Sequence, residues 1–164
     1  MNIELDTDTK ETKIYLAAPI VNIPDEWKMR IEEVYRLLDC IFYDVYYPAK
    51  HGVPNAWGMS MEEWSKCIFA LDVVAINNSD WVVVCDFGRE NTAGTAWEAG
   101  YAFGVGKKIL VVKMVEDGKN YSVMMNGGSS NSISYKEFIN LKDKEDVFKL
   151  FVERGRLQPK EVFN

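Results

Sequence analysis

Residues 94–108 read GTAWEAGYAFGVGKK and lie between two short apolar runs, WVVVC at 81–85 and ILVV at 109–112. Apolar runs of this length, rich in β-branched residues, are typical of strands that are buried on both faces of a parallel sheet. The segment between them has a length that suits one crossover helix. The pattern therefore predicts a strand, a helix and a second strand parallel to the first.

The predicted crossover helix carries a carboxylate and several small residues. Gly94, Gly100 and Gly104 are expected on one side of it, where its backbone could approach the sheet or a ligand. Glu98 falls near the first turn, at the carboxyl end of the sheet, where open α/β folds bind their ligands. Two interpretations of Glu98 are open at this point: a site residue, or an acid that complements the helix dipole.

The composition limits the classes of protein to consider. With 164 residues, 48% of them hydrophobic, the chain is long enough for one domain with a core and too apolar to be disordered. Its formal net charge of −6 argues against binding to a nucleic-acid polymer or an anionic membrane. No apolar run approaches membrane-spanning length, and the polar residues 1–13 do not have the pattern of a signal peptide.

The chain has few residues for metal or thiol chemistry. Cys40, Cys67 and Cys85 stand in apolar surroundings and are expected to be buried free thiols in a reducing compartment, which favours a cytoplasmic location. His51 is the single histidine and is expected to be exposed in a loop with glycine and proline. Neither a zinc site nor a Ser-His-Asp triad fits this set, so we expect no metal and no cofactor.

Strand and helix patterns alternate along the chain. They predict an α/β fold, a doubly wound sheet of four or five parallel strands with helices on both faces. We expect a polar lead-in at 1–12, a single domain at 13–154 and an irregular tail at 155–164. The other elements are predicted as strands at 13–18, 41–47 and from 133, helices at 24–39, 60–76, 121–125, 135–139 and 143–153, and loops at 49–59 and 127–132.

Two more acids and a tyrosine are candidates for chemistry. Asp72 lies within an apolar helix face, so it is either turned to solvent or held in a site. Asp86 follows the strand at 81–85, where catalytic acids are found but loops also simply become polar. Tyr15 lies inside the first strand and suits the core, although a buried hydroxyl would need a partner.

Three large apolar residues have ordinary structural interpretations. Trp64 is expected to anchor the core, and Met124 and Met125 are expected to pack, although methionine is also common at adaptable contact surfaces.

Four short motifs occur in a definite order: KIYLAAP at 13–19, Trp64 eight residues before Asp72, GTAWEAG at 94–100 and SVM at 122–124. Together they resemble the nucleoside 2-deoxyribosyltransferase family over roughly residues 13–126. The Gly-x-x-x-Glu-x-Gly element with a strand on either side is fairly specific, whereas the first-strand motif alone is weak.

The resemblance implies a single flavodoxin-like domain that assembles into homodimers or homohexamers and acts on nucleosides and free nucleobases. It implies that Glu98 is the nucleophile at the anomeric carbon of a 2-deoxyribosyl group, with Tyr15 orienting its carboxylate. Asp72 would contact the base and move a proton to it. Ser122 and Met124 would reach into a neighbouring subunit's site and contact the 5-hydroxyl end of the sugar.

Two positions, 92 and 122, depart from the family pattern. Together with Gly94 and Met124 they make up the expected substrate-binding residues. Thr92 stands where many of these transferases carry a second base-contacting Asp, and Ser122 where they carry Asn. Related 2-deoxynucleoside 5-monophosphate N-glycosidases have hydroxyl residues at these two positions, near the phosphate of their substrate. Hydrolysis of a nucleotide is therefore an alternative function. In that case Arg89 could contact the phosphate. Pro19 and Val21 replace the Ser and Arg of those hydrolases, which favours transfer.

A third hypothesis belongs to a different class. A non-catalytic nucleotide-binding module would keep the fold, with Thr92 as a mark of lost chemistry. The presence of Tyr15, Asp72 and Glu98 together argues against it.

Overall fold

The computed structural model describes residues 12–88, 93–116 and 121–152. Most of the expected lead-in, the expected tail, Arg89 and Thr92 lie outside these described residues.

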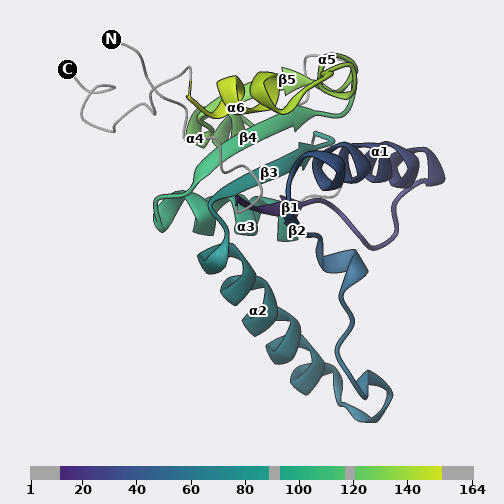
Figure 1. Ribbon diagram of the computed structural model, residues 1–164. Coiled ribbons are helices and arrows are strands. Elements are labelled where there is room, and N and C mark those ends of the chain that lie inside the picture. The colour runs from purple at the N-terminus through teal and green to yellow at the C-terminus, as the bar shows by residue number, and fades with distance from the viewer. Residues whose placement is uncertain (1–11, 89–92, 117–120, 153–164) are drawn as a thin grey trace.

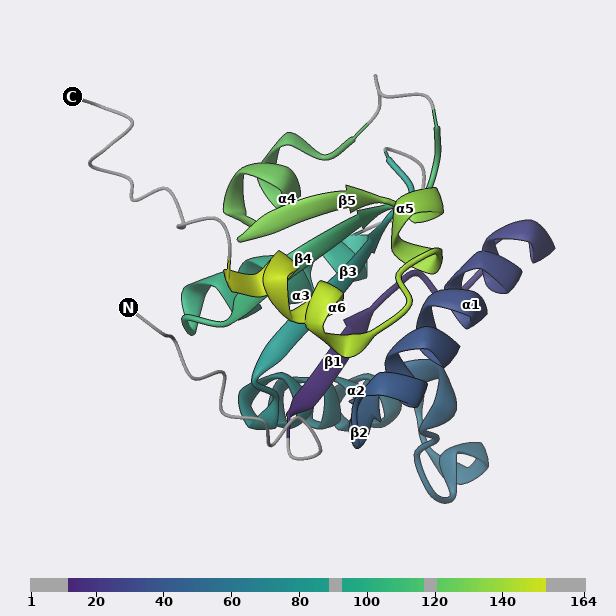
Figure 2. The ribbon, with the colours of Figure 1, turned by 45° about the horizontal axis from the view of Figure 1, so that its top comes forward.

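Five parallel strands form one sheet in the order β2-β1-β3-β4-β5. Figure 2 shows them in this order, from β5 at the top to β2 at the bottom. The order reverses between β1 and β3, and open α/β sheets bind ligands at such a switch point, beyond the carboxyl ends of the strands. The strand bounds are β1 (Lys13–Ala17), β2 (Asp44–Tyr46), β3 (Trp81–Asp86), β4 (Lys108–Lys113) and β5 (Asn131–Ser134).

The helices divide between the two faces of the sheet, as the alternating pattern predicts. Buried side chains of α1, α5 and α6 share one core with the sheet, and those of α2, α3 and α4 share the other. The helix bounds are α1 (Asp25–Ile41), α2 (Met61–Asn78), α3 (Ala93–Gly104), α4 (Val123–Gly128), α5 (Tyr135–Ile139) and α6 (Lys144–Val152), with short 3-10 turns η1 (Pro48–Lys50) and η2 (Ala56–Gly58).

The two cores differ in the size of their side chains. The core under α1, α5 and α6 is built from large residues such as Leu38, Phe138 and Phe151. The core under α3 uses Ala99 and Ala102 against the valines of the central strands. Small side chains bring α3 close to the sheet, so a residue on its flank can reach a side chain that rises from β1.

Helix α2 departs most from its predicted packing. Its capping box forms as expected, with Ser60 Oγ accepting from the Glu63 N–H at 3.2 Å and Glu63 accepting from the Ser60 N–H at 2.8 Å. Only Ile76 of this helix is buried. Leu71 and Val74, expected on an apolar packing face, are 41% and 56% exposed. Figure 1 shows the helix extending away from the sheet.

Three other predictions are wrong in detail. Helix α1 continues to Ile41, so β2 keeps only three residues of the predicted strand at 41–47. The segment 127–132, predicted as a loop, contains the end of α4 and the first residues of β5. Cys85 is buried as expected, but Cys40 is exposed and Cys67 is only partly buried.

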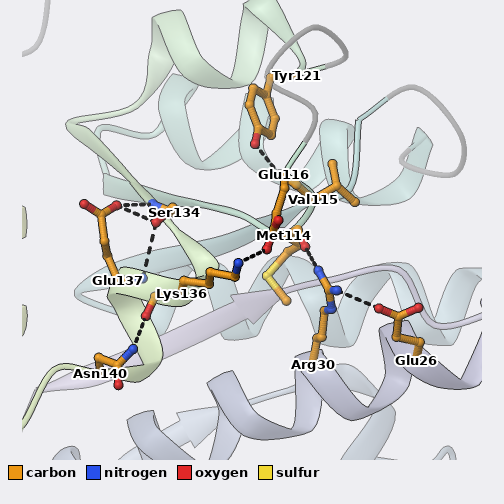
Figure 3. A network of polar contacts seen from close by, with 10 residues as sticks. All are labelled: Glu26, Arg30, Met114, Val115, Glu116, Tyr121, Ser134, Lys136, Glu137 and Asn140. Atoms are coloured by element: carbon orange, nitrogen blue, oxygen red, sulfur yellow. Dashed lines mark hydrogen bonds and ion pairs between the residues drawn. The ribbon is translucent and has the colours of Figure 1, made fainter.

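A polar network fixes the exit of β4 against α1 and α5 (Figure 3). Arg30 of α1 donates to the Met114 carbonyl oxygen at 2.5 Å and pairs with Glu26 at 2.6 Å. Lys136 of α5 pairs with Glu116 at 2.5 Å, and the Tyr121 hydroxyl donates to the Val115 carbonyl oxygen. These contacts anchor both described ends of the connection that leads from β4 to α4.

Within the described ranges, no helix is both long and apolar enough to cross a membrane.

Candidate active site

Tyr15 and Glu98 meet on the face of the sheet that α2 and α3 cover. Tyr15 rises from β1, is fully buried and donates its hydroxyl proton to Glu98 Oε1 at 3.0 Å. The buried phenol hydroxyl thus has the hydrogen-bond partner that it needs. Glu98 is the sixth residue of α3, whose first turn contains no acid. The helix-dipole interpretation is therefore wrong, because the dipole effect falls off within the first turn.

Asp72 shares a cavity with Glu98. The cavity, about 380 Å³ in volume, lies between α2 and α3 and contains both carboxyl groups. Asp72 is partly buried and not turned to solvent. The other lining residues are Trp64, Ser65, Ile68, Phe69, Gly94 and Trp97.

Burial sets the protonation of the two acids. It raises the pKa of Asp72 to about 6. It also raises the pKa of Glu98, which reaches about 8; the Tyr15 hydrogen bond works in the opposite direction, and the charge of Asp72 adds to the rise. Burial, followed by the charges of Glu98 and Asp72, raises the pKa of Tyr15 far above its ordinary value, so its hydroxyl remains a proton donor. Near neutral pH the site thus holds two acids of unequal strength and one fixed donor.

Aromatic side chains form one wall of this cavity. The rings of Phe69 and Trp97 lie 5.2 Å apart, and Trp97 stacks on Tyr101 at 5.3 Å. Trp64, predicted to anchor the core, is instead 38% exposed and lines the cavity. Phe69 and Trp97 line the cavity but are not among the expected site residues, although they stand three residues before Asp72 and one before Glu98 in the sequence. Flat apolar surfaces of this kind suit the face of a planar ring.

The three glycines of α3, unlike Ala99 and Ala102, do not serve close packing against the sheet. Open space surrounds Gly94, Gly100 and Gly104. Gly94 lines the cavity with Glu98, whereas Gly100 lines a different one. The expectation that the three glycines share one side is therefore wrong.

Ser122 and Met124 lie away from Glu98. They line a second cavity of about 430 Å³, together with Ala96, Gly100 and Phe103 of α3. Positions 96 and 98 are two residues apart, and in a helix with 3.6 residues per turn they face nearly opposite sides. Within one chain, α3 thus separates Ser122 and Met124 from the Tyr15, Asp72 and Glu98 group.

The beginning of α4 presents one methionine and buries the next. Ser122 Oγ accepts from the Met125 N–H at 3.2 Å and caps the helix. Met125 packs in the core as expected, whereas Met124 is 84% exposed.

Asp86 fastens this helix to the end of β3. Its carboxylate is fully buried and accepts from the Gly88 N–H at 2.8 Å, the Ser122 N–H at 3.1 Å and Asn126 Nδ2 at 3.3 Å. Gly88 has a φ of 86°, a conformation that favours glycine. Asp86 therefore joins the loop that leads to α3 with the start of α4.

Several solved structures share the fold. A 2-deoxyribosyltransferase from Bacillus psychrosaccharolyticus is 22% identical with a TM-score of 0.61, over 80% of this chain and 93% of the other. The CMP N-glycosidase BcmB from Clostridium botulinum is 23% identical with a TM-score of 0.55, over 84% and 99%. A conserved protein from Enterococcus faecalis V583 is 20% identical with a TM-score of 0.54, over 87% and 98%. These likenesses confirm the predicted flavodoxin-like fold.

The sequence itself gives the family. No curated protein sequence matches the chain. The family profile described as nucleoside 2-deoxyribosyltransferase matches residues 14–138, which include most of β1 and all of α2, α3 and α4. The protein therefore belongs to the nucleoside 2-deoxyribosyltransferase family.

Proposed function

We propose that this protein cleaves the N-glycosidic bond of 2-deoxynucleosides and transfers the sugar to another nucleobase through a covalent intermediate on Glu98. The observation that carries the proposal is the pair of carboxyl groups of Asp72 and Glu98 in one cavity, with the Tyr15 hydroxyl held on Glu98. Family membership supports chemistry on nucleosides and nucleobases.

In the first step, a Glu98 carboxylate oxygen attacks the anomeric carbon. The bond from that carbon to the base nitrogen breaks, its electron pair stays on the base, and Asp72 donates a proton to the base. In the second step, a nitrogen of the incoming base attacks the same carbon, the ester bond to Glu98 breaks, and Asp72 takes up the proton that this base loses.

The pKa values define which form of the site can react. Asp72, with a pKa of about 6, holds its proton in a minority of the molecules near neutral pH and can donate it to the base in that form. Glu98, with a pKa of about 8, holds a proton in most of the molecules, so the reactive form is the minority one with the proton on Asp72 and the charge on Glu98. Glu98 must be ionised to attack, and the Tyr15 hydroxyl stabilises its charged form. Tyr15 is thereby a residue that orients the nucleophile.

We further propose a homodimer or homohexamer in which α4 of one chain completes the site of its neighbour. The support is that Ser122 and Met124 lie across α3 from Glu98, with Met124 exposed. The exposed Leu71 and Val74 of α2 supply apolar surface for such an assembly.

The test is base exchange. Purified protein is incubated with a deoxynucleoside and a second free base, and the products are separated by chromatography. The proposal expects a new deoxynucleoside, and Glu98→Ala should form none while keeping its circular dichroism spectrum. Free sugar without a new nucleoside would favour hydrolysis, and binding without base release would favour a non-catalytic module.

A 2-deoxynucleoside 5-monophosphate N-glycosidase is the second candidate, because residue 122 presents a hydroxyl at the start of α4. Turnover of a deoxynucleoside is compared with turnover of its 5-monophosphate. A strong preference for the unphosphorylated substrate excludes this candidate.

A further inference from the structure

A second tyrosine stands beside Tyr15. β1 and β2 pair in register so that Tyr15 lies opposite Tyr46, and the two rings stack with centroids 5.6 Å apart and an interplanar angle of 16°. Side chains at paired positions of neighbouring strands project from the same face of a sheet. The ring of Tyr46 therefore forms a flank of the ring whose hydroxyl donates to Glu98.

His51 also stacks on Tyr46. The two rings are nearly parallel, at 3°, with centroids 4.3 Å apart. His51 follows η1, and its backbone N–H donates to the Pro48 carbonyl oxygen at 3.0 Å. Tyr46 thus stacks on both Tyr15, in the buried site, and His51, in the exposed loop after β2, and the three rings form one stacked cluster.

The loop that carries His51 is fastened to α1. Lys50 pairs with Glu32 at 2.9 Å and lies over the ring of Tyr35 at 5.0 Å. Tyr47, at the start of the same turn, is buried and packs beside Tyr35. His51 is therefore held against Tyr46 by contacts on its own loop.

Tyr46 is also close to the two carboxyl groups of the candidate site. Burial raises its pKa, and the negative charges of Asp72 and Glu98 raise it further. Such electrostatic effects are strong only over short distances in a partly buried site.

We propose that Tyr46 is a positioning residue: its ring, stacked on both Tyr15 and His51, holds the Tyr15 hydroxyl on Glu98. This inference rests on the proposed function, in which Glu98 is the nucleophile. Tyr46 acts through Tyr15 and makes no contact with the reacting atoms. The edge strand β2 and the loop after it thereby set the geometry of the nucleophile.

The primary test measures the titration of Glu98 itself. Protein with 13C-labelled Glu carboxyl carbons is titrated by NMR, and the Glu98 signal is assigned by its loss in Glu98→Gln. Tyr15→Phe removes a hydrogen bond that lowers the Glu98 pKa, so the pKa should rise above about 8. Tyr46→Leu should raise it in the same direction, because Tyr15 is no longer held. Adding Tyr46→Leu to Tyr15→Phe should cause no further rise.

Two control variants test whether a change in the Glu98 titration of Tyr46→Leu comes from loss of the aromatic ring. Tyr46→Phe keeps the ring and should restore the wild-type titration, and Tyr43→Leu removes a tyrosine that is 81% exposed and should change nothing. A fall of the Glu98 pKa in Tyr46→Leu would mean that Tyr46 only excludes water, and would overturn the proposal. An unchanged pKa, or an equal shift in Tyr46→Phe, would also overturn it.

Kinetics give a second readout. Tyr46→Leu should lower kcat by about tenfold, the order expected for one hydrogen bond, without raising KM. A rise in KM alone would overturn the proposal, because it would indicate substrate contact. If the wild type transfers no sugar, the proposed function fails, but the NMR titration still decides the role of Tyr46.

If Tyr46→Leu does not fold, the same NMR titration is carried out on His51→Ala. His51 is exposed, so its truncation leaves the core intact. A smaller rise of the Glu98 pKa supports the role of the stacked cluster, and an unchanged titration overturns it.

Discussion

Tyr15 and Glu98 are 83 residues apart in the sequence, yet one hydrogen bond joins them. The bond matters because Glu98 is in a site that disfavours its charge. Burial and the neighbouring Asp72 both raise the Glu98 pKa and act against ionisation, whereas the hydrogen bond from the Tyr15 hydroxyl lowers that pKa. A nucleophile that is held in this way is costly to ionise and reactive once ionised.

The pH dependence of kcat/KM should be bell-shaped, because only the form with one proton on the Asp72 and Glu98 pair has both an acid and a nucleophile. The rate should rise as pH passes about 6 and fall as it passes about 8, the two values that burial sets for the pair. The measurement is kcat/KM across pH 5 to 9.5, a range that extends about one unit below the lower value and about 1.5 units above the higher one.

Asp72→Asn should change the shape of this profile and also its height. Without the charge of Asp72, the Glu98 pKa should fall below about 8, and the rate should increase through that lower value with no descending limb. We expect a loss of about 10²-fold at the optimum, less than for Glu98→Ala, and unequal for purine and pyrimidine substrates. A descending limb that persists unchanged would assign the acid to another residue.

At the scale of elements, α3 and α4 are positioned by what they contact at their ends. The fully buried Asp86 accepts from three N–H donors, one just beyond the end of β3 in a buried hydrogen bond and two at the start of α4 in part-buried ones. Buried donors that lose their acceptor are left unsatisfied, which is expensive.

Asp86→Ala should therefore destabilise the protein by about 2 kcal/mol and displace α4. The measurement is urea unfolding followed by circular dichroism. Asp44→Ala is the matched control: its carboxylate makes an exposed ion pair with Lys13 at 4.0 Å, and the loss should stay below about 1 kcal/mol. Equal losses in the two variants would contradict the role given to Asp86.

The elements themselves could be predicted where local signals decide them. The apolar runs of β3 and β4 and the Ser60 capping box stand in the structure as predicted. The boundary between α1 and β2 could not be predicted, because Ile41 suits a helix and a strand equally.

The candidate site was predictable in part as a set of residues but not as an arrangement. Tyr15, Asp72 and Glu98 follow from short motifs, whereas the stacking of Tyr46 on Tyr15 depends on strand register, which no local pattern encodes. The apolar stripe of α2 was predicted to pack inside one chain. An apolar stripe has the same spacing whether it faces its own core or another surface.

At the scale of the whole molecule, the expected site residues are divided between two sides of α3. If α4 completes a neighbour's site, two defective chains can repair one another. Glu98→Ala and Met124→Ala, each with low activity alone, should regain about a quarter of the wild-type activity after mixing and subunit exchange, since half of the dimers would be mixed and each would hold one intact site.

Activity in the mixture is compared with the sum of the two separate variants, and the oligomeric state is measured by light scattering. A strictly additive activity in mixtures shown to exchange subunits would contradict a shared site.

The central claim is that Glu98 carries the sugar between the two bases. The most direct measurement is mass spectrometry of the protein after acid quench during turnover of a deoxynucleoside without an acceptor base, followed by peptide mapping. The account predicts a deoxyribosyl ester on the peptide that contains Glu98, absent from Glu98→Ala and lost when a free base is added before the quench. A sugar attached to another residue, or full base exchange by Glu98→Ala, would contradict it.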